Sequence, residues 1–484
     1  MARYDFDVLV IGGGSAGLTV ASGAARLGAK TLLAEREERL GGDCLHYGCV
    51  PSKTLIHASR VYHFMQHAEN FGLPPVFPPP VEFPRLAARI REVVGTIQKH
   101  DSPERFCSLG AQVEFGPARF LDEHTVEVGE KRFTARSIVV ATGSRAWIPD
   151  LPGFAETEFL TNRELFDLEH LPSSLIVLGG GAVACEMAQA FARLGSRVSL
   201  VQRSAQLLSS EDEDMAALVR ESLAADSVVV TTSAQVGSIG RDRAHKHVVC
   251  DTDRGRMRVM GAEILVALGR APNVSGLGLE NAGVDHDRRG IRVDERMRTS
   301  RPHIFAAGDV TGRHQTTHAA GYEGGIVVAN AVLRLPRKAD YTFMPRCTFT
   351  DPELACVGMN EREAKRAGLD YSVRYEDFAE NDRALAEGSG AGRLKLVLDG
   401  RGRPRGVQLA GPHAGELVAQ WVALFSSGGR LTDMAGAVQP YPTLAEINKR
   451  AAGGIVGEKL FSPKVKKILQ FLFSYRGSAC SSTE

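Results

Sequence analysis

The chain has 484 residues, of which 43% are hydrophobic and 24% are charged, as in soluble globular proteins, and this length predicts about two to four domains. Its 58 basic and 57 acidic residues give a net charge of +1, which argues against a nucleic-acid-binding body or an acidic-substrate funnel built on bulk charge. We expect no signal peptide, because Met1–Asp7 carries charges and leads straight into an apolar strand. No stretch is apolar for long enough to span a bilayer. Eight cysteines do not form a disulfide scaffold in so long a chain, so we expect a reducing, cytoplasmic environment.

The first predicted element is a buried parallel strand at Phe6–Ile11, followed by a glycine-rich turn and a helix that runs to Leu27. A second strand at Lys30–Ala34 ends at Glu35. The turn has three glycines at the spacing G-x-G-x-x-G: Gly12, Gly14 and Gly17. Such a turn lets the backbone and a helix N-terminus approach a pyrophosphate, while the acidic residue binds ribose hydroxyls. The pattern predicts a dinucleotide site, and the alternative is a glycine-rich turn of another α/β protein.

Two cysteines, Cys44 and Cys49, follow in the stretch Gly41–Lys53. One distorted turn, which Gly48 permits, brings their sulfurs together. A thiolate at a helix N-terminus near Lys53 has a lowered pKa and attacks well. We therefore predict a disulfide that opens and closes in a redox reaction. The alternatives are a zinc half-site or two unpaired core cysteines, and zinc would need a second pair of ligands.

The rest of the first domain combines helices with short strands. In chain order we expect a helix at Thr54–Asn70, an extended proline-rich loop at Leu73–Pro84, a helix at Arg85–Leu109, a β-meander at Ala111–Phe133 and a strand at Ser137–Thr142 that ends before Gly143.

The nucleotide-binding pattern then repeats between the strands Ser174–Leu178 and Arg197–Val201. The glycine turn has the form G-x-G-x-x-A, with Gly179, Gly181 and Ala184. Gln202 and Arg203 stand where the first copy has its acid, so nothing repels a 2′-phosphate. We therefore predict NADPH, with NADH possible and a solvated Arg203 as the alternative interpretation. Two dinucleotide folds beside a redox disulfide imply a flavin as the second dinucleotide.

A later strand at Ala262–Ala267 closes the second fold, and Thr299–Asp309 returns to the first. Asp309 could accept a hydrogen bond from a flavin ribityl hydroxyl, or cap the helix predicted at His318–Leu333. Beyond Tyr341 we expect an antiparallel sheet and further helices, the clearest at Met344–Phe349, Leu354–Met359, Leu394–Leu398 and Glu416–Ser426.

Four apolar residues near the end of the chain have helical spacing: Val465, Ile468, Leu469 and Leu472. Lysines 464, 466 and 467 stand between them. Such a stripe can lie on a membrane surface, but we expect it to pack against its own protein or the dimer mate. Cys480 follows in a serine-rich end.

With these motifs the whole chain resembles the flavin-dependent pyridine nucleotide–disulfide oxidoreductases, which include dihydrolipoamide dehydrogenase, glutathione reductase and mercuric ion reductase. The motifs are Gly12–Gly17, Gly41–Lys53, Gly179–Glu186, Ala267–Asn273, Thr299–Asp309 and Tyr441–Glu446. The chain is most similar to mercuric ion reductase, in the segments Glu186–Gly195, Phe349–Pro352 and Arg383–Ala386.

The resemblance implies an α/β fold with two Rossmann-like domains, one nested in the other, and a C-terminal α+β dimerisation domain. The expected domains are 1–149 (FAD, first part), 150–273 (NAD(P)H), 274–340 (FAD and central, second part), 341–460 (dimerisation) and 461–484 (amphipathic tail). It also implies a homodimer in which the C-terminal domain completes the partner's active site.

The resemblance assigns roles to particular residues. Cys49 would lie against the flavin as a charge-transfer thiolate, Cys44 would be the outer thiol that meets substrate, and Lys53 and Glu186 would pair where hydride arrives. The expected catalytic residues are Cys44, Cys49, Lys53, Glu186, Tyr441 and Glu446. The expected cofactor-binding residues are Gly12, Gly14, Gly17, Glu35, Gly42, Lys53, Ala118, Gly143, Asp309, Gly179, Gly181, Gln202, Arg203 and Gly269.

Tyr441 gives information about the electron acceptor. The thiol–disulfide reductases have at this position a histidine that acts as an acid–base group. A phenol is a poor base at neutral pH, whereas soft Hg(II) needs thiolates more than a proton shuttle. We therefore expect no structural metal, but a substrate metal ion such as Hg(II) held by Cys44, Cys49 and Tyr441. In place of the vicinal cysteine pair with which mercuric ion reductases usually end, the tail has only Cys480. The alternatives are another soft metal, a small disulfide, a dihydrolipoamide-type dehydrogenase using NAD, or a redox-sensing flavoprotein of low turnover.

Overall fold

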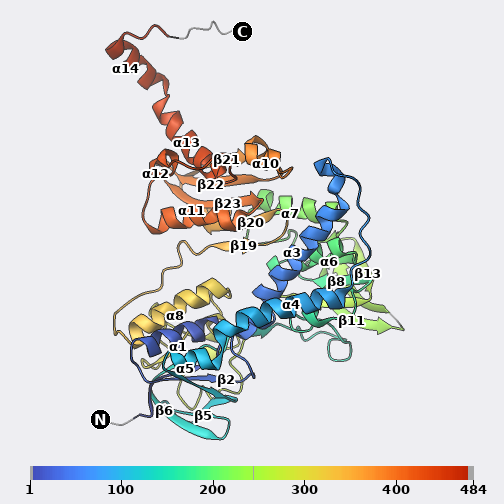
Figure 1. The fold of residues 1–484 in the computed structure, drawn as a ribbon, viewed down its shortest axis with the longest axis vertical. Coiled ribbons are helices and arrows are strands. Elements are labelled where there is room, and N and C mark those ends of the chain that lie inside the picture. The colour runs from blue at the N-terminus through green and yellow to red at the C-terminus, as the bar shows by residue number, and fades with distance from the viewer. Residues whose placement is uncertain (1–3, 244, 478–484) are drawn as a thin grey trace. The chain divides into compact units, whose positions relative to one another are not determined.

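The computed structural model describes residues 4–243 and 245–477. The chain divides into two compact units (Figure 1). The first unit comprises Met1–Leu207 and Leu223–Tyr341, and the second comprises Leu208–Ser222 and Thr342–Glu484. The division into five domains stays a prediction. Cys480 lies outside the described residues.

The first unit contains a seven-stranded sheet in the order β3-β2-β1-β6-β5-β4, with β18 beside β6. Its strands are β1 (Phe6–Ile11), β2 (Thr31–Glu35), β3 (Ala111–Phe115), β4 (Ala118–Phe120), β5 (Thr125–Val128), β6 (Lys131–Val140) and β18 (Ile304–Ala306). Strands β3, β2, β1, β6 and β18 are parallel, as expected for strands buried on both faces. Because β18 comes from far along the chain, this sheet is built from two segments, and the predicted strand at Phe6–Ile11 is confirmed.

Two helices pack together beside this sheet: α1 (Ser15–Arg26) and α8 (Thr317–Ala331). Small residues bring them close, because a Cβ added to Gly23 would lie 2.8 Å from a methyl of Val328. Asp309 starts a short 3-10 helix at Asp309–Thr311, while α8 is preceded by Thr316 at its N-cap. The interpretation of Asp309 as the cap of that helix is therefore wrong, since the chain turns between the two helices.

The first unit also contains a parallel sheet in the order β10-β9-β8-β14. Its strands are β8 (Ser174–Leu178), β9 (Arg197–Val201), β10 (Val229–Thr231) and β14 (Glu263–Val266). Helix α6 (Ala182–Leu194) follows β8, so the predicted strand, glycine turn, helix and strand are all present. A three-stranded antiparallel sheet consists of β11 (Gln235–Asp242), β12 (His245–Thr252) and β13 (Gly255–Gly261). Two short pairs, β7 (Ser144–Ala146) with β15 (Arg270–Pro272) and β16 (His286–Asp287) with β17 (Gly290–Ile291), complete the strands.

The helices after the cysteines differ from the prediction at their boundaries. The observed elements are α2 (Gly42–His46), α3 (Cys49–Gln66), η1 (Ala68–Phe71), α4 (Phe83–Gln98), η2 (Lys99–Asp101) and α5 (Pro103–Ser108). The single helix predicted at Arg85–Leu109 is wrong. Ser102 is extended, with ψ 150°, and its hydroxyl accepts a hydrogen bond from the amide of Arg105. Pro103 disfavours a helical residue before it and suits the first position of a new helix, so the chain makes two.

The second unit is built on an antiparallel sheet in the order β19-β20-β23-β22-β21. The strands are β19 (Arg346–Thr348), β20 (Glu353–Gly358), β21 (Tyr371–Asp377), β22 (Arg393–Asp399) and β23 (Pro404–Gly411). The helices are α9 (Glu361–Arg366), α10 (Asp382–Ala386), α11 (Ala414–Ser426), α12 (Leu431–Gly436), α13 (Glu446–Leu460) and α14 (Pro463–Phe473). Trp421 is fully buried in the core and donates a hydrogen bond to Asn448 across 2.7 Å.

The start of helix α7 (Glu213–Ala225) is part of the second unit, to which a buried lysine connects it. The side chain of Lys395 is 2% exposed, and its ammonium lies 3.1 Å from Asp212, 2.8 Å from Asp214 and 2.7 Å from Glu361. Three carboxylates around one buried ammonium compensate its desolvation and tie 208–222 to the sheet. Among the helices that the structure describes, none is long and apolar enough to cross a membrane.

Candidate active site

Cys44 and Cys49 occupy two successive helices, α2 and α3, and Cys49 is the first residue of α3. A Cβ added to Gly48 would lie 3.0 Å from the carbonyl oxygen of Asp43 and 3.2 Å from the Cα of Cys44. Gly48 has φ −127°, so it is needed here for space and not for a left-handed conformation. In the structure both cysteines are thiols, Cys49 exposed and Cys44 half-buried.

The two thiols differ in acidity. The hydrogen bond between them lowers the pKa of Cys49 to about 6, against the opposing effect of burial. The hydroxyl of Thr317, 3.1 Å from the Cys49 sulfur, and the charge of Lys53 lower this pKa further. The hydrogen bond to Cys49, with burial, raises the pKa of Cys44. The dithiol therefore holds its proton on Cys44, and Cys49 carries the negative charge at neutral pH.

Helix termini explain why the charge settles on Cys49. Cys49 opens α3, and its sulfur touches Thr317, the first residue of α8. The N-terminus of a helix carries a partial positive charge that favours an anion. Cys49 thus lies beside the N-termini of two helices, α3 and α8, which are far apart in the sequence.

Lys53 and Glu186 form an ion pair of 2.7 Å between α3 and α6. The side chain of Glu186 is 4% exposed, whereas that of Lys53 is 36% exposed. A buried carboxylate needs such a partner to stay ionised. The pairing joins the cysteine helix to the second nucleotide fold, as the resemblance implied.

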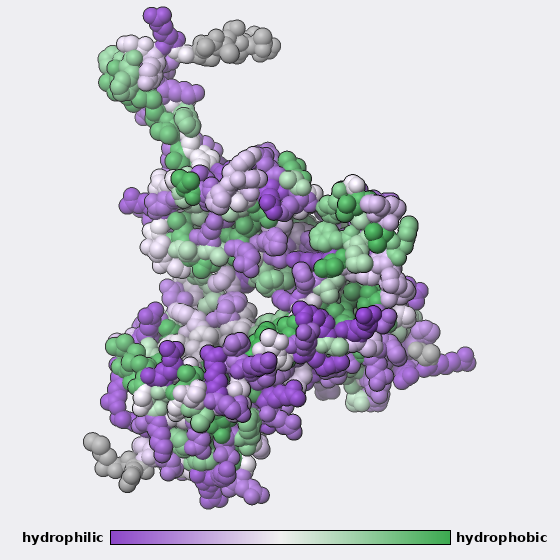
Figure 2. Space-filling view, in the orientation of Figure 1, coloured by the Kyte–Doolittle hydropathy of each residue, from purple (hydrophilic) through white to green (hydrophobic). Residues whose placement is uncertain are grey.

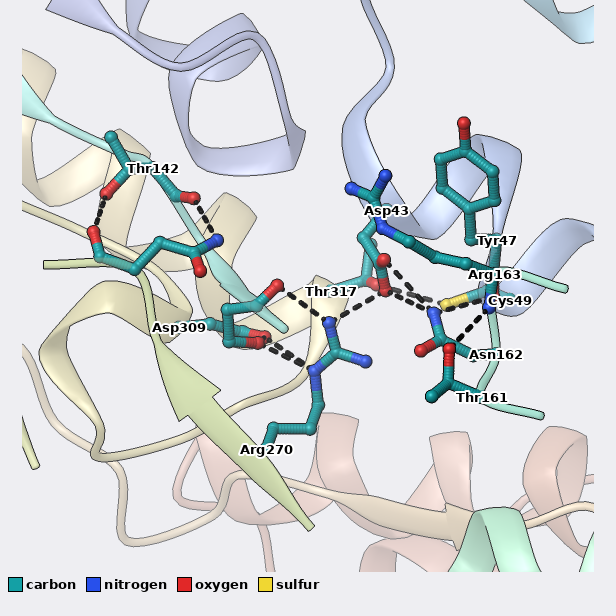
Figure 3. A network of polar contacts seen from close by, with 12 residues as sticks. Asp43, Tyr47, Cys49, Thr142, Thr161, Asn162, Arg163, Arg270, Asp309 and Thr317 are labelled. Atoms are coloured by element: carbon teal, nitrogen blue, oxygen red, sulfur yellow. Dashed lines mark hydrogen bonds and ion pairs between the residues drawn. The ribbon is translucent and has the colours of Figure 1, made fainter. Parts of the chain in front are cut away.

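A polar network surrounds the segment before Cys44 (Figure 3). The Arg270 guanidinium lies 2.8 Å from a carboxylate oxygen of Asp43 and 3.5 Å from one of Asp309. Asp309 also accepts a hydrogen bond of 2.5 Å from Ser144. The amide of Asn162 donates to Asp43 from 3.1 Å. Burial raises the pKa of Asp309, while Ser144 and Arg270 oppose the rise. Arg270 therefore links the cysteine segment to Asp309.

The first glycine turn has the shape that a dinucleotide requires. Gly12 has φ +108°, and a Cβ there would lie 2.3 Å from the carbonyl oxygen of Ala141. A Cβ added to Gly42 would lie 2.7 Å from the Cα of Gly14, so two bare backbones meet at the N-terminus of α1. A Cβ on Gly17 would lie 1.8 Å from the oxygen of Gly12. Only glycines fit this close approach, which suits a pyrophosphate.

The other predicted FAD residues lie at the ends of strands of the same sheet or in the loop that follows one of them. Glu35 ends β2, and its carboxylate accepts hydrogen bonds from the amides of Gly13 at 2.6 Å and Glu37 at 2.8 Å. Ala118 begins β4, and Gly143, with φ +68°, lies between β6 and β7. Their assignment to the FAD site stays a prediction.

The second glycine turn is more open. Gly179 has φ +118°, and a Cβ there would lie 2.3 Å from the carbonyl oxygen of Ala267. A Cβ on Gly181 would meet no described heavy atom within 4 Å, at the N-terminus of α6. Gln202 follows β9 and packs by Gly180, and Arg203 beside it is exposed. Gly269, with φ +122°, precedes β15. The turn can therefore receive a second dinucleotide.

Tyr441 and Glu446 belong to the second unit. Tyr441 is 70% exposed, and its hydroxyl donates a hydrogen bond of 2.7 Å to Asp382. This bond and the carboxylate charge raise the pKa of Tyr441. Glu446 begins α13 and accepts a hydrogen bond of 3.4 Å from the amide of Thr443. Tyr441 is therefore held as a neutral phenol.

Sequence reasoning did not select Thr317, Arg270, Asp43 or Asn162. Asp43 and Arg270 stood within recognised motifs, but they are 227 positions apart, and only the fold brings them together. In the described part of the chain, no group of three or more His, Cys, Asp or Glu side chains is arranged to hold a metal ion.

The comparisons with known proteins agree with this geometry. The family model described as "Pyridine nucleotide-disulphide oxidoreductase" matches residues 6–324, and that family's dimerisation domain matches 344–452. The chain therefore belongs to the pyridine nucleotide–disulfide oxidoreductases. It is an FAD-dependent oxidoreductase of this class with a pyridine nucleotide as electron donor.

Relatives with two different activities match almost the whole chain. A dihydrolipoyl dehydrogenase of Bacillus subtilis is 34% identical over 93% of this chain and 98% of its own length. A mercuric reductase of Streptomyces lividans is 33% identical over 93% and 96%. Among solved structures, the Cu(II) complex of the HOCl-induced flavoprotein disulfide reductase RclA from Escherichia coli has a TM-score of 0.83 at 27% identity, covering 94% of this chain and 99% of that one.

Proposed function

We propose that this enzyme uses NADPH to reduce a thiol-bound soft metal ion, such as Hg(II), at the Cys44–Cys49 dithiol. The observation that carries this proposal is Tyr441, an exposed phenol hydrogen-bonded to Asp382. Its raised pKa makes it a poor base at neutral pH. A soft metal ion needs two thiolates and no proton shuttle at that position. For Hg(II) bound by two thiolates, one NADPH and one proton yield Hg(0), two thiols and NADP⁺.

The chain's own residues have separate tasks in this reaction. Bound FAD supplies the conversion of a hydride into an electron pair that sulfur can accept. Cys49 would be the thiolate beside the flavin, and Cys44 would be the outer thiol that takes the metal from its carrier thiols. Lys53 holds Glu186 at 2.7 Å and lowers the pKa of Cys49. Gly12, Gly14, Gly17 and Glu35 would hold the adenine-nucleotide half of FAD, and Asp309 would hold its ribityl chain. The Cys44 sulfur forms a bond to the metal, one carrier thiolate leaves the metal, and the Cys44 proton goes to that thiolate, which departs as a thiol.

We infer that the donor is NADPH. Gln202 and the exposed Arg203 follow β9, at the place where the first fold has the carboxylate of Glu35. A carboxylate there would repel the 2′-phosphate of NADPH, whereas an arginine can bind it. Arg203→Ala should raise the KM for NADPH about tenfold and leave that for NADH nearly unchanged. Arg197→Ala, at the exposed start of the same strand, is the matched control. Equal effects of Arg203→Ala on the two nucleotides would contradict this inference.

The second candidate is a dihydrolipoyl dehydrogenase that uses NAD. It is favoured by relatives with that name at 34% and 36% identity. The Cu(II) complex of RclA makes copper a further metal to test.

The family's dimerisation domain at 344–452 supports a homodimer, in which Tyr441 would serve the partner's site.

Steady-state kinetics separate these candidates. NADPH oxidation should accelerate with Hg(II) in excess thiol, and Cys44→Ser and Cys49→Ser should abolish the acceleration. Cys107→Ser, at another exposed cysteine, is the control. Faster reduction of NAD⁺ by dihydrolipoamide than reduction of Hg(II) or Cu(II) would replace the proposal with the second candidate. Slow turnover with every acceptor would indicate that the protein is a redox-sensing flavoprotein.

A further inference from the structure

Helix α14 (Pro463–Phe473) has no buried residue, although it is rich in apolar side chains. Phe471 is 86% exposed, Leu472 63% and Phe473 60%. Val465, Ile468, Leu469 and Leu472 fall on one face at helical spacing. Packing against the same subunit, one half of the expectation, is therefore wrong, while packing against the dimer mate stays a prediction. In the described protomer the apolar face of α14 is uncovered.

The chain reaches α14 through a short break. Helix α13 ends at Leu460, Ser462 is extended with ψ 151°, and Pro463 begins the new helix. Figure 1 shows α14 continuing from α13 away from the sheet of the second unit. In Figure 2 the end of the second unit formed by this helix shows apolar and polar residues together on the surface. α14 is thus a separate amphipathic segment on a short connection.

The charge around α14 is strongly one-sided. From Lys459 to Gly477 there are five basic residues and no acidic one. Without these five, the chain has 53 basic and 57 acidic residues. Lys466 and Lys467 lie with Gln470 on the face opposite the apolar stripe. The rest of the chain therefore has a net charge of −4 (53 − 57), and the five basic residues of 459–477 make the whole chain net positive.

The family's dimerisation domain matches residues 344–452, so α14 lies outside the matched segment. An apolar face flanked by lysines and bordered by exposed aromatic side chains, here Phe471, Phe473 and Tyr475, suits the boundary between acyl chains and anionic headgroups. We propose that α14 docks the enzyme on the surface of an anionic lipid bilayer, with its apolar face inserted and its lysines at the headgroups.

Vesicle sedimentation with the FAD-loaded full chain tests this proposal. The enzyme should sediment with vesicles of phosphatidylglycerol and phosphatidylcholine but not with phosphatidylcholine alone, and salt should weaken the binding. Ile468→Asp with Leu472→Asp should reduce the binding more than tenfold. Lys466→Gln and Lys467→Gln should each reduce it about fivefold. Gln470→Ser, on the same polar face, should bind as the wild type does.

Two further readouts keep the result interpretable. The rate of flavin reduction by NADPH should be the same in all these variants, which shows that they fold. Light scattering should give each variant the molar mass of the wild type. Equal sedimentation with both kinds of vesicle, or no sedimentation, would overturn the proposal. So would a fall in the molar mass of the double aspartate variant, because α14 would then hold the subunits together.

Discussion

The sulfur of Cys49 lies 3.1 Å from the hydroxyl oxygen of Thr317, which begins a helix 268 positions further along the chain. Together with the hydrogen bond from Cys44 and the charge of Lys53, this contact sets the pKa of Cys49 at about 6. The thiolate is therefore present above about pH 6 and lost as the pH falls below it. The redox chemistry that we propose for this site depends on this difference in acidity between the two thiols.

Thr317→Val should move the ionisation of Cys49 to higher pH by about one pH unit, because a hydrogen bond to a charged group is lost. In the reduced wild type, the rate of Cys49 alkylation by iodoacetamide, followed by mass spectrometry, should rise with a midpoint near pH 6. Thr317→Ser keeps the hydroxyl and should keep this midpoint. An unchanged midpoint in the valine variant would show that Thr317 does not stabilise the thiolate.

Lys53→Met should act on two properties at once. It takes the ammonium away from the buried carboxylate of Glu186, which should lower the free energy of unfolding by about 1–3 kcal/mol, less than for a fully buried pair because Lys53 is partly exposed. It should also raise the pKa of Cys49. Thermal unfolding and the alkylation profile measure the two effects, and Lys53→Arg should restore most of both. Loss of stability without a change in the profile would limit Lys53 to a structural role.

Arg270→Gln should weaken FAD binding, because Arg270 links Asp43 to the buried carboxyl of Asp309. Without the guanidinium the pKa of Asp309 should rise further, and the Asp43 segment loses its anchor. Release of fluorescent FAD on heating should therefore begin at lower temperature. Arg145→Gln is the matched control, since Arg145 lies on the neighbouring strand β7 and is exposed. Identical release from both variants would remove Arg270 from the FAD site.

Tyr441→His should speed the exchange of the dithiol with dihydrolipoamide by about tenfold or more, because imidazole transfers protons at neutral pH where the phenol does not. It should also slow Hg(II) reduction if Tyr441 contacts the metal. Tyr441→Phe separates the gain of an imidazole base from the loss of the hydroxyl that binds Asp382, since it removes the hydroxyl and adds no base. A histidine variant without increased thiol exchange would show that this position does not select the acceptor.

Much of the first unit could be predicted from the sequence, because its signals are local. The strand Phe6–Ile11, the glycine turns and the start of a helix near the cysteines depend on residues close together in the chain. The helix break at Ser102 was missed because apolar periodicity continued past Pro103.

The partners of the site residues could not be predicted, because they are long-range contacts. Thr317 reaches Cys49, and Arg270 reaches Asp43, only when β18 and β15 come back to the first fold. Likewise, no pattern along the chain showed that the carboxylate of Glu35 would accept a hydrogen bond from the amide of Gly13. Local patterns identify which residues react, and the tertiary fold determines which residues set their pKa values.

The proposed function requires electrons to pass through the two sulfurs of Cys44 and Cys49. Anaerobic alkylation and mass spectrometry, before and after one equivalent of NADPH, follow the redox state of this pair. We predict a disulfide between these cysteines in the oxidised holoenzyme and alkylation of both after NADPH. Two alkylated thiols before NADPH, or a disulfide that persists after it, would contradict the account.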